Sequence, residues 1–389
     1  MSWSTFCGSA LRGTVAVFAL CGAVSCAGND GDEGAIAQQS AALLTLPGAW
    51  YTTAPQYATC LYRAVSVSAA CASPQSVNSL GAVNGVTRVA PGQYRVFLGG
   101  MSANGNAQVV AIGNDNVRCN LATIGPAGGG VQAEVRCRSP LGAGVDSQFE
   151  LSYYRETNVG GPLGAYARVR GFVAPLTVFD GWNSQPSFIS AGTLGVGRYR
   201  VFFGGQTFPN GTVLVTSASG QPGHCKVAAL TSLVGAPGVQ VDVNCFSLSG
   251  NPQNDEFSIA YHQNVRGDAR NPLAGGTQGG FSRVTPWAAV NPSFSRNTCA
   301  AGANTAAFLG AGRYTDKIHA IGASPAVRPS AALVTAFGID ASYCKLSQVW
   351  SAIPGADAVL DVHCFRGDGA VLLNSEHNVM FTLQDGGGC

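Results

Sequence analysis

A nine-residue segment that occurs twice, with a third diverged copy, limits what this chain can fold into. The segment 92–100 reads GQYRVFLGG and returns at 197–205 as GRYRVFFGG, whereas 312–318 reads GRYTDKI and has lost the central Val and Phe. Alternating apolar residues between glycines are typical of short β-strands. The spacing of the copies predicts three tandem units of about 100 residues each, a usual size for a domain.

A pair of cysteines follows each copy of the segment. The second cysteine of each pair ends a strand in which every other residue is apolar, at 131–137, 239–245 and 358–364. The cysteines of a pair are 18 to 20 residues apart, which leaves room for two neighbouring strands and one connection. We therefore predict the bridges Cys119–Cys137, Cys225–Cys245 and Cys344–Cys364, each stabilising its unit by about 3 kcal/mol through loop closure.

Four more of the 13 cysteines suggest two further bridges. Cys60–Cys71 would close a short loop before the first copy, and Cys299–Cys389 would tie the last residue to the start of the third unit, although position alone does not determine connectivity. The close C-x-x-C pairs of thiolate metal sites do not occur in the sequence. We accordingly expect disulfides formed outside the cytosol, no metal site and no cofactor.

The expected fold class is all-β, because no long stretch keeps a 3.6-residue apolar period and short strands alternate with Gly-rich turns. We predict three tandem antiparallel β-sandwich modules of jelly-roll type, each with an internal disulfide. The expected boundaries are a signal peptide at 1–25, a linker at 26–55, and modules at 56–158, 162–268 and 278–389. Segments rich in Gly, Pro and Asn separate the modules.

The first 26 residues have the pattern of an export signal. Arg12 precedes the apolar run 14–24, which is too short for a comfortable membrane span. The run leads into AVSC at 23–26, which resembles the lipobox of bacterial lipoproteins, with Ala where that family more often has Leu. The resemblance implies lipidation of Cys26 and anchoring in the cell envelope, with the outer membrane favoured. Simple secretion with cleavage near Ala27 is the alternative.

Charge composition narrows the choice of partners. Charged residues make up 11% of the chain and the formal net charge is +2, so no basic footprint for nucleic acid is expected. A glycan or a surface protein is the expected partner. We expect membrane contact only through the N-terminal lipid anchor.

No catalytic motif is present in the sequence. The motifs GxSxG and HExxH and phosphate-binding Gly loops are absent, and the glycines fall at strand ends. The five histidines are dispersed: His363 occupies an outward strand position, and His224 only precedes a cysteine. Asp146 and Asp255 lie just before the last strands of modules one and two, where capping of a turn explains them without calcium. We therefore predict no catalytic residue.

Two tryptophans are the best candidates for ligand contacts. Trp182 lies beside Asp180 and Asn183, and Trp287 lies in a comparable stretch of the third module. An exposed Trp next to Asp and Asn would stack on a sugar and hydrogen-bond to it. The alternative is that both rings cover the end of a core.

The module resembles those of exported bacterial proteins, most of them uncharacterised. The resemblance rests on the GxYxVxFxG segment, the GxVxV stretch that follows it, and the cysteine pair that ends in VxVxC. A fainter likeness, in GxYxVxF and a later DxxF, is to jelly-roll domains related to the C1q family, found also on phage fibres, from which the cysteine pair departs. These resemblances imply a fold and carry no catalytic residues.

Two functions follow as hypotheses. The first is a non-catalytic lipid-anchored or secreted repeat protein used for binding, adhesion or envelope structure, with glycans as the ligand class. The second is a secreted hydrolase whose active site is assembled between modules.

Overall fold

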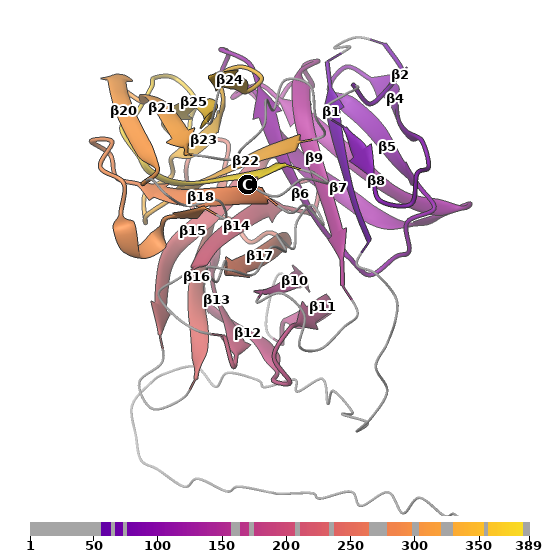
Figure 1. The fold of residues 1–389 in the computed structure, drawn as a ribbon, viewed down its shortest axis with the longest axis horizontal. Coiled ribbons are helices and arrows are strands. Elements are labelled where there is room, and N and C mark those ends of the chain that lie inside the picture. The colour runs from indigo at the N-terminus through magenta and orange to yellow at the C-terminus, as the bar shows by residue number, and fades with distance from the viewer. Residues whose placement is uncertain are drawn as a thin grey trace, which may run out of the picture. The chain divides into compact units, whose positions relative to one another are not determined.

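The computed structural model describes residues 56–63, 67–72, 76–156, 164–170, 175–206, 211–232, 237–263, 278–297, 303–319, 330–353 and 357–383, which all belong to the unit 36–389 of the chain. These residues are nearly all β (Figure 1), and the helical element among them is a short 3₁₀ turn, η1, at Pro292–Phe294. The predicted signal peptide, the lipidation site Cys26, and Cys299 and Cys389 lie outside the described residues.

Each third of the described chain contributes strands to two antiparallel sheets in the same order. We call these thirds the first repeat (56–156), the second repeat (164–263) and the third repeat (278–383). In each repeat, the motif sheet contains the strand of the repeated segment. The axial sheet contains the strand that meets the other two repeats.

The motif sheets share one strand order. In the first repeat the order is β2 (Ala69–Ala70), β4 (Asn84–Ala90), β5 (Gln93–Gly99), β8 (Gly130–Arg138), β7 (Arg118–Ala127). In the second it is β12 (Ile189–Gly195), β13 (Arg198–Gly204), β16 (Gly238–Ser247), β15 (Gly223–Ser232). In the third it is β20 (Thr305–Gly310), β21 (Arg313–Ile318), β25 (Asp357–Phe365), β23 (Tyr343–Leu346), and β25 also pairs with β24 (Ser351–Ile353).

The axial sheets repeat in the same way. In the first repeat the order is β3 (Val77–Asn78), β1 (Gln56–Tyr62), β9 (Gln148–Arg155), β6 (Asn106–Ile112). In the second it is β11 (Thr177–Asn183), β10 (Gly164–Arg170), β17 (Phe257–Gln263), β14 (Gly211–Ser217). In the third it is β19 (Arg296–Asn297), β18 (Gln278–Val284), β26 (Glu376–Leu383), β22 (Ser330–Phe337).

The repeats are joined through the edges of their sheets. β15 pairs in parallel with β22, and β23 pairs in parallel with β6, through the residue pairs Val227–Phe337 and Leu346–Ile112. At the remaining junction, between β7 and β14, the Gly220 N–H donates to the Leu121 carbonyl at 3.2 Å. The repeats therefore contact one another in a cycle around β6, β14 and β22 (Figure 1).

The tyrosine of the repeated segment has the same structural role in all three repeats. Each tyrosine is buried, and its hydroxyl accepts a hydrogen bond of 2.9 to 3.1 Å from a backbone N–H just before the last strand of the repeat. The pairs are Tyr94–Ser147, Tyr199–Asp255 and Tyr314–Ser375. Because a buried N–H needs a partner, this bond explains why the segment keeps Tyr rather than Phe.

The glycine that opens the segment is held by a side chain from the turn before the last strand. Its N–H donates to Asp146, Asn254 or Asn374 at 2.7 to 2.9 Å, and its φ lies between 61° and 66°, where glycine is favoured. Asp146 also forms an ion pair with Arg88, whose Nη2 lies 2.8 Å from Oδ2 of the carboxylate. Asp146 thus caps a turn as predicted, and its counterpart in the second repeat is Asn254 rather than Asp255.

Four of the five predicted bridges are confirmed. Cys60–Cys71 closes the local loop of the first repeat. The other three join residues directly opposite one another on the last two strands of each motif sheet, with Cα atoms 4.0 Å apart: Cys119–Cys137, Cys225–Cys245 and Cys344–Cys364.

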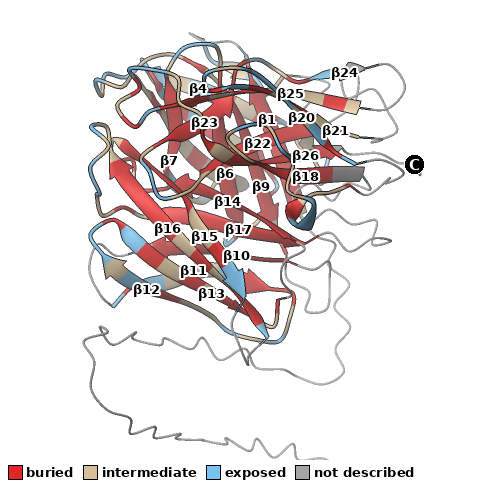
Figure 2. Ribbon diagram, turned by 90° about the vertical axis from the view of Figure 1, so that its left-hand side faces the viewer, coloured by how far each residue is buried: buried red, intermediate tan, exposed pale blue. Residues whose placement is uncertain are grey.

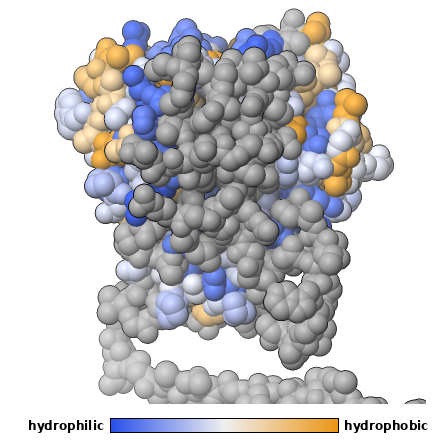
Figure 3. All heavy atoms as spheres, viewed as in Figure 1, coloured by the Kyte–Doolittle hydropathy of each residue, from blue (hydrophilic) through white to orange (hydrophobic). Residues whose placement is uncertain are grey.

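Hydrophobic packing extends across the repeat boundaries. The first and second repeats each have a cluster between their own two sheets. A further cluster combines the core of the third repeat with apolar residues from the axial sheets of the other two, including Leu61, Ile112, Tyr154 and Leu214. β6 and β14 are buried along their whole length (Figure 2). Seen from the direction of Figure 1, the surface of the described residues shows hydrophobic and hydrophilic residues interspersed (Figure 3).

Candidate functional site

The axial sheets and the edges of the motif sheets line a cavity of about 50 Å³ where the three repeats meet. Each repeat supplies equivalent positions to its lining: three consecutive residues of the axial strand and three centred on the first cysteine of the bridge. These positions are 109–111 and 118–120, 215–217 and 224–226, and 334–336 and 343–345. We call this space the axial cavity.

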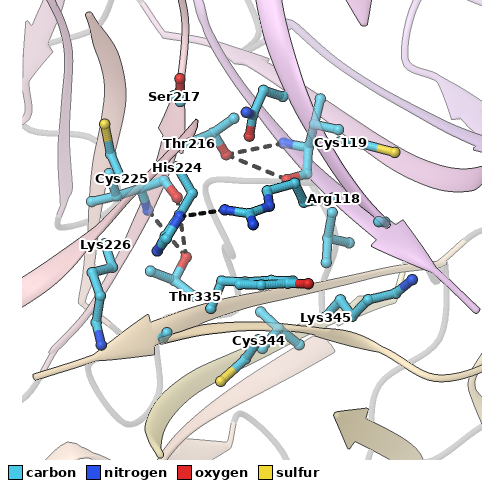
Figure 4. A pocket seen from close by; sticks show the side chains of 18 residues that line it. Arg118, Cys119, Thr216, Ser217, His224, Cys225, Lys226, Thr335, Cys344 and Lys345 are labelled. Atoms are coloured by element: carbon cyan, nitrogen blue, oxygen red, sulfur yellow. Dashed lines mark hydrogen bonds between the residues drawn. The ribbon is translucent and has the colours of Figure 1, made fainter. Parts of the chain in front are cut away.

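Arg118 and His224 point toward one another across the axial cavity (Figure 4). Arg118 Nη1 lies 2.9 Å from His224 Nδ1, and the guanidinium stacks 4.3 Å from the ring centre of Tyr343. His224 Nε2 lies 3.2 Å from the carbonyl oxygen of Ser342. These partners assign the proton of the neutral ring to Nε2, because the guanidinium can only donate. Burial and the charges of Arg118 and Lys226 hold the pKa of His224 well below its usual value.

Two lysines of the lining, Lys226 and Lys345, extend away from the axial cavity (Figure 4). Their ammonium groups reach carboxylates of the next repeat. Lys226 Nζ lies 2.6 Å from Asp340, and Lys345 Nζ lies 2.5 Å from Asp115. Burial lowers the pKa of both ammonium groups, and the carboxylates oppose that shift. These pairs join the second repeat to the third and the third to the first. Asn120 makes the corresponding contact from the first repeat, donating to the Gly223 carbonyl at 2.6 Å.

The lining of the axial cavity offers no arrangement for hydrolysis. Its serine, Ser217, is 1% exposed and donates to Asp255 at 2.5 Å, so it has no access to a substrate. Burial raises the pKa of Asp255 to about 6. A nucleophile needs both a base and room for the group that it attacks. The lining of the axial cavity is therefore suited to binding a charged group and not to hydrolysis.

A second hollow, a cleft of about 270 Å³, lies between the first and second repeats and includes the predicted site residue Asp180. Phe179 forms one wall, with Arg168 stacked on its ring at 4.1 Å and Arg170 at 4.6 Å. Asp180 lies 3.7 Å from Arg168 Nε, and burial raises the pKa of its carboxyl, opposed by both arginines. Asp180 is therefore a neighbour of the cleft arginines and does not accompany an exposed Trp.

The structure corrects the expected role of Trp182. Its ring is only 9% exposed and packs against Tyr154 and Tyr166, with ring centres 6.3 and 5.7 Å away. It cannot stack on a sugar, because its faces are already covered inside the cluster that joins the repeats. For Trp182, the alternative that the ring covers the end of a core is the correct one.

Asn183 also has a structural role. Its amide donates to the Gly204 carbonyl at 2.9 Å, and the equivalent Asn78 donates to the Gly99 carbonyl at 2.8 Å. The side chain therefore ties the axial sheet to the end of the repeated segment in both repeats. A recurring Asn 16 residues before the motif tyrosine is the sequence signal for this role.

Trp287 is 73% exposed, in contrast to Trp182. The two tryptophans are not at equivalent positions. Trp182 lies opposite Tyr166 in the second repeat, and the corresponding strand pair of the third repeat places Arg296 opposite Phe281. Arg296 is therefore the counterpart of Trp182. Trp287 lies instead in the turn after β18, with its ring centre 5.9 Å from that of Phe308. This aromatic pair is the surface feature that corresponds best to the predicted ligand contact.

The diverged third copy carries a buried polar pair. Asp316 occupies the position of Val96 and Val201, and His377, where the other repeats have Phe, lies 2.8 Å from it. The His377 ring is 4.8 Å from Tyr314, a packing that Phe149 and Phe257 provide elsewhere. A ring nitrogen of His377 and the sulfurs of Cys344 and Cys364 lie within 4.8 Å of one another, but sulfurs joined in a disulfide offer no thiolate to a metal.

Sequence reasoning missed the axial cavity. His224 was interpreted only as the neighbour of a cysteine, whereas Arg118, His224 and Tyr343 occupy one equivalent position beside the first cysteine of each pair. The available signal was that two of the lysines directly follow those cysteines, Lys226 and Lys345. No protein-family model, curated protein or solved structure matches the chain. The functional argument therefore rests on geometry.

Proposed function

We propose that the protein is a non-catalytic exported repeat protein of three jelly-roll-like units, with a role in binding, adhesion or envelope structure. Glycans are the ligand class that we propose. The observation that carries the binding role is the exposed aromatic pair Trp287 and Phe308. An exposed indole face offers a large apolar area to a sugar ring and loses little conformational entropy on binding.

The turn that presents Trp287 is held at both ends. The Ala288 N–H donates to the Thr285 carbonyl at 3.0 Å, and the Thr285 N–H donates to the Ala289 carbonyl at 2.9 Å. The hydroxyl of Tyr314 donates to the Pro286 carbonyl at 3.0 Å, so the motif tyrosine anchors the same turn to the core. A platform held in this way supports binding, because little freedom remains to be lost.

Export and lipid anchoring belong to the same proposal. Four disulfides support an extracytoplasmic location, since such bridges persist in oxidising compartments. In the part of the chain that the structure describes, no helix has the length and apolar character to cross a bilayer. We propose that Cys26 carries the lipid anchor. Peptide mapping of the mature protein without reduction tests this modification, and an unmodified N-terminus downstream of Cys26 would indicate secretion instead.

The hydrolase with a site between repeats is the second candidate, and the cleft of Asp180 is the observation that favours it. A carboxyl with a raised pKa in a cleft has the property of a general acid. Glycoside hydrolysis needs a second carboxylate, and Asp180 is the only one in the described lining of this cleft. The arginines on Phe179 are better suited to holding an anionic group than to catalysis.

Binding of envelope polysaccharides by a soluble form that begins at residue 45 tests the proposed function. We expect Trp287→Ala to weaken binding by about tenfold or more, as loss of a central aromatic anchor usually does. Ile339→Ala, at an apolar side chain that is 80% exposed elsewhere, is the matched control and should bind normally. Equal binding by both variants would exclude Trp287 as the platform. Turnover of a polysaccharide that is lost in Asp180→Asn and kept in Trp287→Ala would favour the hydrolase.

A further inference from the structure

The axial cavity contains a buried guanidinium, that of Arg118, which forms no ion pair with a carboxylate among the described residues. The carboxylate whose charge acts on it is that of Asp368, which is itself paired with Arg366. Arg118 is 4% exposed, and Nη2 donates to the Gly367 carbonyl at 2.7 Å, while Nη1 faces the neutral His224. Its Nε is buried and has no hydrogen-bond partner among the residues that the structure describes. No acidic residue occurs among the 18 residues that line the cavity.

The other cations of the lining do not share this situation. Lys226 and Lys345 each reach a carboxylate, although both carboxylates are half-exposed to water. Because the charge of each lysine is paired outside the lining, Arg118 is the cation of the lining that lacks such a partner. The neutral ring of His224 and the face of Tyr343 stabilise the guanidinium but do not cancel its charge.

An unpaired buried cation is costly, and structures normally supply a counter-charge. The axial cavity, at about 50 Å³, has room for more than one water-sized particle, for which about 10 to 15 Å³ is needed in the same measure. A sugar ring or a nucleotide does not fit in that volume. The missing counter-charge is therefore a small anion.

We propose that a chloride ion binds in the axial cavity against the Nε–H of Arg118, where the three repeats meet. The ion would neutralise the guanidinium at the point where the three repeats meet. The chloride site does not depend on the proposed ligand platform at Trp287. A negative result for one of the two would therefore not count against the other.

Bromide provides a direct test on the full-length mature protein. Crystals grown or soaked with bromide in place of chloride should give an anomalous peak beside Arg118 Nε. Only water at this position in bromide would overturn the proposal. This measurement uses the unaltered protein and so does not depend on whether a variant folds.

Stability in two salts is the second test. At equal ionic strength, Tm should be several degrees higher in sodium chloride than in sodium gluconate, whose anion is too large for the cavity, because a ligand that binds only the folded state stabilises it by mass action. Arg118→Gln should abolish the difference. The control Arg200→Gln alters an arginine paired with Asp242 on the motif sheet of the second repeat and should keep it. The same Tm of the unaltered protein in both salts would contradict the proposal.

Discussion

At the residue scale, the second repeat differs from the others at one buried carboxyl. Asp255 occupies the position of Ser147 and Ser375, whose backbone N–H groups make the same bond to a motif tyrosine. It is 2% exposed, and burial raises its pKa to about 6 although Ser217 and Ser219 both donate to it. Folding therefore favours the protonated form of this carboxyl over its ionised form.

This shift predicts a pH dependence with a definite sign. Since the folded pKa is raised from 3.8 to about 6, the stability that Asp255 contributes is fully present below pH 3.8 and is lost as the pH rises through about 6. Asp255→Ser restores the residue of the other repeats. When the pH is raised from 4.5 to 8, the free energy of unfolding of this variant should therefore increase by about 2 to 3 kcal/mol relative to that of the unaltered protein. Urea unfolding at the two pH values measures this difference.

The matched control is Asp368→Ser, at an exposed carboxylate whose partner Arg366 lowers its pKa to about 2. Asp368 is ionised in both the folded and the unfolded state throughout this pH range, so its replacement should leave the pH dependence unchanged. A pH-independent effect of Asp255→Ser would show that Asp255 is ionised in the folded protein.

At the element scale, the strands could be predicted from the sequence and the junctions between repeats could not. The strict alternation of Val131, Ala133, Val135 and Cys137 is reproduced in β8, where all four are buried. A period-2 pattern with a cysteine at a defined position specifies a strand, its inward face and its neighbour. The joins of β15 to β22 and of β23 to β6 rest on single residue pairs between distant edge strands, which leave no periodic signal.

The same limit explains the error at Trp182. Sequence patterns report how a residue alternates with its immediate neighbours. They do not report that Tyr154 of another repeat covers its ring. The cavity residues Arg118 and His224 were hidden for the same reason, since their contact spans 106 positions of the chain.

The axial strands make a contact that occurs in two of three equivalent places. The Val109 N–H donates to Thr216 Oγ1 at 3.2 Å, and the Val215 N–H donates to Thr335 Oγ1 at 3.1 Å. In the first repeat the equivalent of these threonines is Val110, which has no hydroxyl. Thr335→Val should therefore destabilise the protein by about 1 to 3 kcal/mol, since it leaves a buried N–H without this acceptor.

Val110→Thr is the complementary change and should raise stability by about 0.5 to 1.5 kcal/mol, the net value of a typical hydrogen bond. Chemical unfolding of both variants provides the measurement. Loss of stability in both would mean that the first repeat does not approach the third closely enough to use a hydroxyl.

At the scale of the whole molecule, the three repeats share a core and do not simply follow one another. The cluster that includes Tyr314, Val362 and Phe381 of the third repeat also includes Leu61 and other residues of the axial sheets of the first and second. The charged contacts run in the same cycle, from Lys226 to the third repeat and from Lys345 to the first. Removal of one repeat therefore exposes apolar surface and strand edges on both of the others.

This sharing predicts how the protein responds to truncation. A chain that ends at residue 263 keeps the first two repeats but leaves β6 without β23 and β15 without β22, and it uncovers the apolar side chains that face the third repeat. Exposed edges and apolar patches favour association. We expect this truncated chain to aggregate or to bind a hydrophobic dye, whereas the full chain should unfold in a single calorimetric transition.

A protease site placed in 264–277, between β17 and β18, separates the effect of the missing repeat from that of a broken chain. After cleavage the third repeat should remain bound and Tm should change little, because non-covalent packing joins the repeats. Size-exclusion chromatography of the cleaved protein measures this. A truncated chain that is monomeric and unfolds cooperatively at the Tm of the full chain would show that each repeat is a domain with a core of its own. Dissociation after cleavage would show that the connection, rather than the shared core, holds the third repeat in place.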